Sequence, residues 1–244
     1  MDQIGKGMAL FSKKAGLHLN SNKTQVLRIG GRGCTNNAKL KLLGVTVNNK
    51  LRFDEHHADM ARNLRRCVGA VRRLATGISR GPLLCEVGRA LVVGKAQCAA
   101  WVTRSVRLNR KLEDKPPTDA CQVALNDLAR VLLGKKRSDC INCATLAEKA
   151  KLPTINEIVT KQAAMAAWKS LNGADGSSLA GLLEPQDSRT RGGISGLVNP
   201  TSVRCIAVTN MANVWNASEA LRSAKTIAEA KKCANDLAKS VRTF

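Results

Sequence analysis

The clearest hydrophobic pattern in the chain lies between residues 54 and 76. Apolar side chains recur there at helical spacing and fall on one side of a helix: Met60, Leu64, Cys67, Val68, Val71 and Leu74. Five arginines fall on the other side: Arg62, Arg65, Arg66, Arg72 and Arg73. Asp54, Glu55 and Asp59 place negative charge near the start, where the helix dipole favours it. The pattern predicts an amphipathic helix whose outer face carries these five residues, the arginine stripe.

Helical periodicity predicts further helices on both sides of this one. The predicted ranges are 1–16, 83–101, 118–133, 154–171 and a C-terminal helix after residue 226. Thr154 and Glu157 have the spacing of a capping box, in which the threonine and glutamate side chains satisfy backbone N–H groups at the helix start. Thr226 and Glu229 repeat that spacing. Both helices therefore have a start signal that is local to the sequence.

Two short segments near the N-terminus have the composition of strands. They are residues 25–29 and 39–47, and glycines between residues 30 and 33 separate them. Asn48 and Asn49, directly after the second segment, predict a turn. The sequence thus predicts a mainly α fold with a small antiparallel β hairpin or sheet near the N-terminus.

Charge changes this picture, because the chain carries a formal net charge of +22. Residues 1–115 hold 23 of the 40 basic side chains and only 7 of the 18 acidic ones. No acidic residue lies between Met60 and Glu86, so i,i+4 ion pairs inside the helix cannot neutralise the arginine stripe. A polyanionic partner accounts for such an excess, with nucleic acid first and an anionic membrane surface second. A merely soluble basic protein is the plainer alternative.

Cysteine usage and apolar runs bear on the compartment. Nine cysteines are scattered through a chain too large to need disulfides, a usage typical of reduced thiols. The N-terminus lacks the apolar run of a signal peptide, and residues 90–93 are too short to cross a bilayer. We expect a soluble intracellular protein of the nucleus or cytoplasm that is not secreted.

Metal-binding patterns are weak. Cys140 and Cys143 form a single Cys-x-x-Cys pair with no second pair nearby, so structural zinc or redox use is disfavoured. His56 and His57 diverge by about 100° on a helix, so packing or capping explains them better than a shared metal. The three tryptophans are expected in the core. No metal site is predicted.

Two ordered blocks carry a family resemblance. Residues 17–24 read LHLNSNKT, and residues 43–47 read LGVTV, followed by LRFDEH at 51–56. The series resembles the later half of the reverse transcriptases of non-LTR retrotransposons. Looser similarity continues in the same order, at residues 128–134, 152–153, 214–216 and 221–225.

The resemblance implies an architecture of a truncated palm followed by a helical thumb-like bundle. Residues 1–50 would be a palm remnant with a primer-grip-like hairpin, and 51–115 a basic, helical, thumb-like region. Residues 116–172 would form a helical connection, 173–200 a flexible linker, and 201–244 a C-terminal helical tail.

Departures from the family pattern bear on catalysis. Family members hold two Mg²⁺ ions through aspartates in an early motif and in an aromatic-Ala-Asp-Asp motif, whereas this chain has no Tyr and no Asp-Asp pair. Only Asp2 precedes Asp54 among the acidic residues, and one carboxylate cannot hold two metals. No cofactor and no catalytic residue are therefore expected. Lys23 matches the family's general-acid lysine, but a phosphate-contacting or solvated role suits it better here.

These observations favour a truncated reverse-transcriptase-like protein that binds nucleic acid without catalysis. Lys23 and the arginine stripe would contact the phosphate backbone of a DNA, RNA or hybrid duplex, with no membrane and no small-molecule substrate involved. Two alternatives stay open. The chain could be a fragment of an active RNA-directed DNA polymerase whose aspartates lie before Met1, or a decayed translation without a selected role.

Overall fold

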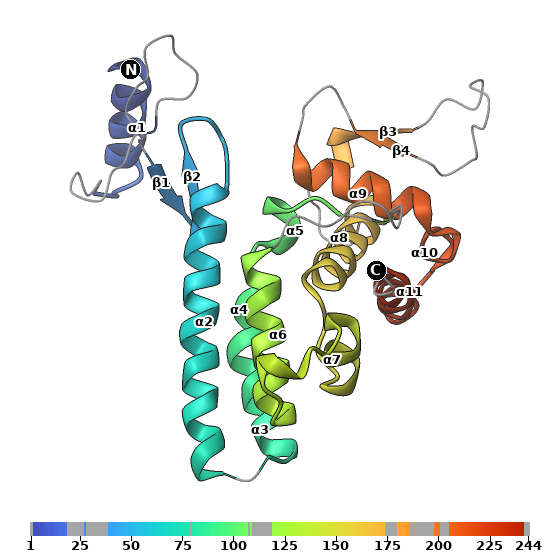
Figure 1. Cartoon of the computed structure of the whole chain (residues 1–244). Helices are drawn as coiled ribbons and strands as arrows, with labels where there is room; N and C mark the ends of the chain where they lie inside the picture. Colours follow the sequence, from blue (N-terminus) through green and yellow to red (C-terminus); the bar gives the residue numbers. More distant parts are fainter. Residues whose placement is uncertain are drawn as a thin grey trace. The chain divides into compact units, whose positions relative to one another are not determined.

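The computed structural model describes residues 2–18, 27, 39–78, 80–106, 108, 119–173, 180–185, 198–200 and 205–241. This part of the chain is mainly helical and holds two short antiparallel strand pairs (Figure 1). The chain divides into two compact units, residues 1–56 and 57–244, and each is described by itself. The predicted class, mainly α with a small antiparallel sheet near the N-terminus, is confirmed.

The first unit contains a helix and a β hairpin. Helix α1 spans Asp2–Lys14, in agreement with the predicted range 1–16. Strands β1 (Lys39–Leu42) and β2 (Val45–Asn48) pair in antiparallel register, with Leu42 opposite Val45. The Asn48 side chain then accepts hydrogen bonds from the backbone N–H groups of Lys50 and Arg52, at 3.0 and 2.8 Å, which turns the chain toward the next helix.

The hairpin corrects the prediction of one strand over residues 39–47. Leu43 and Gly44 both have positive φ, 48° and 86°, and form a two-residue turn in the middle of that segment. Positive φ at both turn positions suits the right-handed twist of a hairpin, but leucine is rarely found at such positions, so no residue pattern indicated this turn. The other predicted strand, 25–29, lies outside the described residues except for Leu27.

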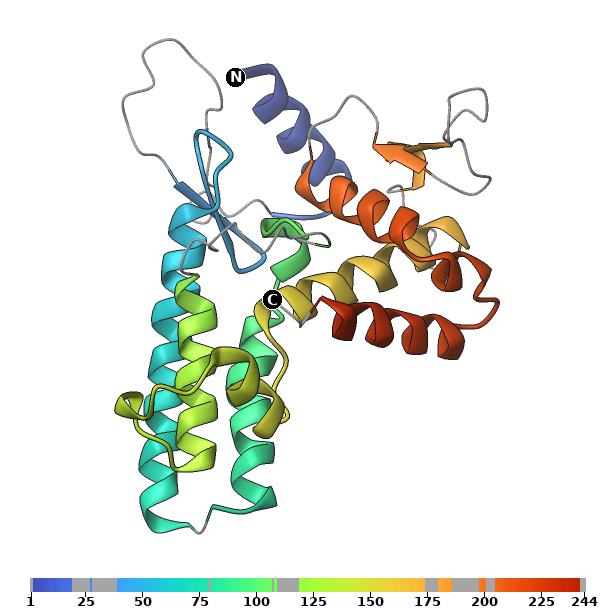
Figure 2. The same cartoon turned by 45° about the vertical axis from the view of Figure 1, so that its right-hand side comes forward.

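Helix α2 (Asp54–Gly77) starts at the predicted residue and ends close to the predicted end. Asp54 and Glu55 occupy its first turn. In the second unit both views show α6 (Ala120–Leu133) running alongside α2 (Figures 1 and 2). Asp119, one residue after Thr118 where the predicted range begins, caps α6 by accepting a hydrogen bond from the Cys121 N–H at 2.8 Å. Thr118 itself lies outside the described residues.

The predicted single helix over residues 83–101 is broken. It is replaced by α3 (Pro82–Gly88), a π-helical segment η2 (Arg89–Val93), α4 (Gly94–Ala96) and α5 (Ala100–Thr103). Ala99 has a left-handed backbone, with φ of 52°, between α4 and α5. Gly88 brings α3 close to α6, since a Cβ atom at this position would lie 3.2 Å from Leu128 Cδ1. The break is therefore fitted to the neighbouring helices.

The rest of the second unit packs around one long helix. After the 3-10 turn η3 (Arg137–Asp139) and α7 (Cys143–Lys149) comes α8 (Ile155–Leu171), which contacts α5, α9 (Ile206–Ala217) and α11 (Ile227–Ser240). Both predicted capping boxes are present, at the starts of α8 and α11. Trp168 and Trp215 are buried and Trp101 is half-buried. The Trp168 Nε1–H donates to the Ala224 carbonyl, just after α10 (Glu219–Ser223), at 2.9 Å.

The predicted linker, residues 173–200, contains regular structure. A 3-10 turn η4 (Ala180–Leu182) leads into β3 (Leu183–Pro185), which pairs with β4 (Val198–Pro200). Asn216 on α9 fixes β4 by hydrogen bonds to both backbone groups of Val198, at 3.0 and 2.8 Å. A sequence poor in apolar residues concealed this pairing. Among the described helices, none has both the length and the apolar character that crossing a membrane requires.

Candidate nucleic-acid interface

Helix α2 separates apolar from basic side chains as the sequence predicts. Met60, Leu64, Val68 and Val71 are buried in the core. All five residues of the arginine stripe are exposed: Arg62, Arg65, Arg66, Arg72 and Arg73. Arginine, leucine and alanine favour the helical state, and burial of the apolar face fixes which way the arginines point. At 1.5 Å per residue, the stripe from Arg62 to Arg73 is about 16 Å long.

The arginines of the stripe differ in their ion pairing. Arg62 Nη1 lies 3.2 Å from Asp59 Oδ1, one helical turn away, so the expectation that ion pairs inside the helix leave the stripe unpaired is wrong for Arg62. Within the described part of the chain, no acidic side chain forms an ion pair with the other four: Arg65, Arg66, Arg72 and Arg73. An exposed pair such as Arg62–Asp59 contributes little and exchanges readily. Four guanidinium groups are thus available to an external anion, and the fifth shares its charge with Asp59.

Gly69 interrupts the stripe between its two groups of arginines. A Cβ atom here would lie 3.9 Å from Arg73 Nη1, so the Arg73 side chain extends back toward the helix N-terminus over this position. Arg73 therefore presents its guanidinium near Gly69 rather than beyond the helix end. The stripe forms two groups, Arg62 with Arg65 and Arg66, and Arg72 with Arg73.

This arrangement suits phosphate groups. A guanidinium can donate two parallel hydrogen bonds to phosphate oxygens, and it keeps its charge at any physiological pH. Contacts of this kind give affinity and orientation but do not read base sequence. They also make binding weaken steeply with salt, by about 0.9 in the logarithmic slope for each phosphate neutralised on duplex DNA.

Lys23, the remaining predicted contact, lies outside the described residues. The block at residues 17–24 that contains it is described only at Leu17 and His18. Lys23 therefore stays a prediction, whereas the five arginines are placed together on one helix face.

Sequence reasoning missed an arginine beyond the end of α2. Arg80 is exposed, and its side chain packs over the glycine that caps α6: a Cβ atom at position 134 would lie 3.3 Å from Arg80 Nε. Gly134 has φ of 66° and ends α6 in a left-handed conformation. Arg80 thus lies at the C-terminus of a helix, where the dipole favours a cation. The available signal was Gly134 as a helix stop, but no local pattern links it to Arg80.

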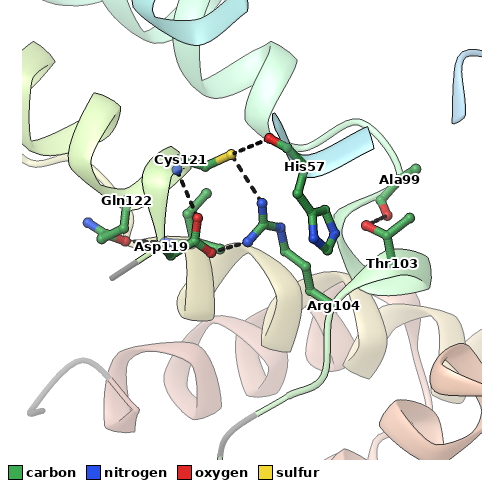
Figure 3. A network of polar contacts seen from close by, with 8 residues as sticks. His57, Ala99, Thr103, Arg104, Asp119, Cys121 and Gln122 are labelled. Carbon is green, nitrogen blue, oxygen red and sulfur yellow. Dashed lines mark hydrogen bonds and ion pairs between the residues drawn. The ribbon is translucent and has the colours of Figure 1, made fainter. Parts of the chain in front are cut away.

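Another arginine, Arg104, is structural. Only 10% of its side chain is exposed, and it forms an ion pair with Asp119 (Figure 3). Arg104 Nη2 also donates to Cys121 Sγ at 3.1 Å, while the thiol donates to the His57 carbonyl at 3.8 Å. Burial raises the pKa of Cys121 to about 11, an effect that the Arg104 charge opposes. The thiol therefore stays protonated near neutral pH, and the network joins α2, α6 and the segment after α5.

The residues considered for metal binding do not gather into a site. His56 Nδ1 accepts a hydrogen bond from the Thr46 N–H at 3.5 Å, within the first unit. Cys140 and Cys143 are exposed, and Asn126 Nδ2 donates to Cys143 Sγ at 3.0 Å. Among the residues described, there is no group of three or more His, Cys, Asp or Glu side chains that could hold a metal ion.

Comparison with known proteins adds no relative: no protein-family model, curated protein or solved structure matches this chain.

Proposed function

We propose that this chain is a reverse-transcriptase-like protein of non-LTR retrotransposon type that lacks the family's aspartate motifs and binds nucleic-acid duplexes without catalysis. In this proposal the β1–β2 hairpin corresponds to the primer-grip hairpin and α2 to the first thumb helix. The two sequence blocks at residues 17–24 and 43–56 support the family assignment.

The observation that carries the binding proposal is the exposure of Arg65, Arg66, Arg72 and Arg73 on one face of α2. The opposite face is anchored in the core, so the guanidinium groups are held along a line instead of being scattered. These four arginines span about 12 Å along the helix axis, and a line of cations matches a phosphodiester backbone, which repeats its charge at short intervals. Phosphates are common to DNA, RNA and hybrid duplexes, so this surface binds all three.

The test is a titration of DNA, RNA and hybrid duplexes of one sequence, followed by fluorescence anisotropy at several salt concentrations. The variant replaces Arg65, Arg66, Arg72 and Arg73 by Gln. A matched control removes the same charge elsewhere, from four exposed lysines on and beside α11: Lys225, Lys231, Lys232 and Lys239. We expect the arginine variant to lower the magnitude of the salt slope by about 3 to 4, and the control to change it little.

Equal losses in the two variants would mean that net charge alone drives binding, with no dedicated face on α2. The catalytic part has its own readout. The purified chain, supplied with Mg²⁺, deoxynucleotides and a primed RNA template, is expected to incorporate no nucleotide. Incorporation that survives purification to homogeneity would contradict the non-catalytic assignment while leaving the binding surface untouched.

A further inference from the structure

Helix α1 exposes a set of large apolar side chains. Met8 is 56% exposed, Leu10 62% and Phe11 68%. At about 100° per residue, the three lie within an arc of about 160° on one side of the helix. Of the α1 residues whose exposure is described, Lys6 to Lys14, only Ser12 is buried. We call Met8, Leu10 and Phe11 the apolar face of α1.

Positive charge accompanies this face on the same helix. Lys6 and Lys13 lie on the opposite side of α1, and Lys14 lies at its C-terminal end, one turn after Phe11. All three lysines are exposed. A lysine can lay its methylene stem along apolar surface while its ammonium group stays among polar groups. The helix therefore presents apolar and cationic groups together, and the one acidic residue in its sequence, Asp2, is at the other end.

The exposure of the apolar face bears on the stability of α1. A helix of 13 residues is marginal by itself in water, and the helices of proteins owe most of their stability to the burial of an apolar face. A partner that covers Met8, Leu10 and Phe11 would therefore stabilise α1 as well as bind it. To match the lysines as well, that partner has to bring an apolar layer and negative charge close together.

An anionic lipid bilayer brings both. An amphipathic helix lies in the plane of the bilayer surface, with its apolar face at the acyl boundary and its basic residues among the anionic headgroups. A nucleic-acid duplex offers phosphates on its outside but no apolar layer broad enough to cover a helix face. A second copy of this chain fits less well, because residues 1–56 hold 10 basic and 3 acidic side chains and two copies would repel each other there.

We propose that α1 binds an anionic membrane surface, lying parallel to it with the apolar face at the acyl boundary and the three lysines among the headgroups. This inference does not rest on the proposed function, because the arginine stripe belongs to α2 and to the other compact unit. The attachment is peripheral, since 13 residues are too few to cross the bilayer. Charge alone ranks a membrane second to nucleic acid and favours a function without one; the exposed face of α1 changes that expectation for the first unit.

The experiment is flotation of the full chain with phosphatidylcholine vesicles that contain or lack phosphatidylserine, at low and at high salt. One variant removes the apolar face: Met8→Ser, Leu10→Ser, Phe11→Ser. A rescue variant, Met8→Leu, Phe11→Leu, keeps the apolar character and the helix propensity. The matched control replaces three exposed apolar residues of the second unit by serine: Leu74, Leu83 and Ile227. Thermal melts confirm that the second unit is folded in every variant.

Two further variants separate α1 from the general positive charge of the chain. The first replaces Lys6, Lys13 and Lys14 by Gln, and its matched control replaces three exposed lysines on and beside α11 by Gln: Lys225, Lys231 and Lys232. The second adds the serine changes on α1 to the four-arginine variant, which removes the attraction of α2 for anionic lipid.

We expect wild type, the rescue variant and the apolar control to bind vesicles that contain phosphatidylserine, and the serine variant to bind them at least about tenfold more weakly. The difference should persist at high salt, which screens the lysines but not apolar burial. Loss of the three α1 lysines should weaken binding at low salt more than loss of the three control lysines. The effect of the serine changes should be the same in the four-arginine background.

Three outcomes overturn this inference. Wild type that does not bind phosphatidylserine vesicles removes it directly. A serine variant that binds as well as wild type would show that charge alone attracts the chain to lipid. Finally, serine changes that weaken duplex binding, or that abolish a dimer seen by sedimentation, while vesicle binding is unaffected, would assign the apolar face to nucleic acid or to a second copy. The proposed function is judged separately, by the duplex titration of the four-arginine variant.

Discussion

The side-chain oxygen of Asn210 accepts a hydrogen bond from the backbone N–H of Val106 at 2.7 Å, although the two residues are 104 positions apart. The Asn210 side-chain nitrogen donates to the carbonyls of Trp101 and Arg104, at 2.7 and 2.6 Å. Asn210 is almost fully buried. One amide on α9 thus satisfies three backbone groups, one in α5 and two in the segment that follows it.

Replacing Asn210 by Leu should therefore destabilise the fold strongly. One buried and two partly buried backbone groups would lose their partner, and we expect the free energy of unfolding to fall by about 2 to 4 kcal/mol. Urea unfolding followed by circular dichroism measures this. Asn213→Leu on the same helix is the control, since Asn213 is exposed and should change stability by less than about 0.5 kcal/mol. Similar values for the two variants would refute the assignment.

Gly134 should tolerate alanine poorly, for two separable reasons. Its φ of 66° is strained for any residue with a Cβ, at about 1 to 2 kcal/mol, and the added atom would crowd Arg80. Gly173→Ala isolates the first term, because Gly173 has a similar φ of 69° and open space around it. We expect Gly134→Ala to cost more than Gly173→Ala in urea unfolding. Adding Arg80→Ala should remove the excess; if the excess persists, Arg80 does not pack as described.

The raised pKa of Cys121 should make the fold less stable in alkali. In the unfolded chain the thiol ionises near pH 8.5, whereas burial in the fold raises its pKa to about 11. Below pH 8.5 both states hold the proton, and the contribution of Cys121 is constant. Between these values the unfolded state releases its proton first, so unfolding becomes more favourable as pH rises.

Urea unfolding from pH 7 to 11 under reducing conditions tests this. Wild type should lose stability faster with pH than Cys121→Ala, so the difference between them should shift against wild type above pH 8.5. The exposed Cys98 supplies the control, because Cys98→Ala should keep the wild-type dependence. Parallel curves for wild type and Cys121→Ala would show that the thiol ionises equally easily in both states.

Individual arginines of the stripe should contribute unequally to binding. Arg62 shares its charge with Asp59 at 3.2 Å, whereas Arg66 forms no ion pair with a described residue. Arg66→Gln should therefore weaken duplex binding more than Arg62→Gln, with a loss of about 0.9 in salt slope. Asp59→Asn should strengthen binding by freeing Arg62. Anisotropy titrations at matched salt measure all three, and a weakening by Asp59→Asn would mean that the carboxylate orients Arg62 productively.

Much of the helical architecture could be read from residues close together in the chain. The capping boxes at Thr154 and Thr226 are present because each joins groups three residues apart. The division of α2 into a buried face and an arginine face follows from its own periodicity. The hairpin lies where a strand was predicted, at residues 39–47, but its turn at Leu43 and Gly44 was missed because the apolar pattern runs through it.

The broken helix after Pro82 shows where local reading stops. Residues 83–101 have a continuous helical pattern, yet Ala99 is left-handed and Asn210 holds the segment beyond it. Arginine usually lies at the protein surface, but the Arg104 side chain is largely buried and pairs with Asp119. The Arg80 side chain packs over Gly134. No sequence window contains either pair.

Helices α1, α2, α6, α8 and α11 and the basic face of α2 could therefore be predicted from the sequence, because they depend on neighbours within about one helical turn. The packed fold was needed to show where the predicted helix 83–101 breaks, which arginines are used inside the fold, and which stay exposed without an acidic partner among the described residues. Those outcomes depend on contacts between segments far apart in the chain, whose geometry exists only once the helices have packed.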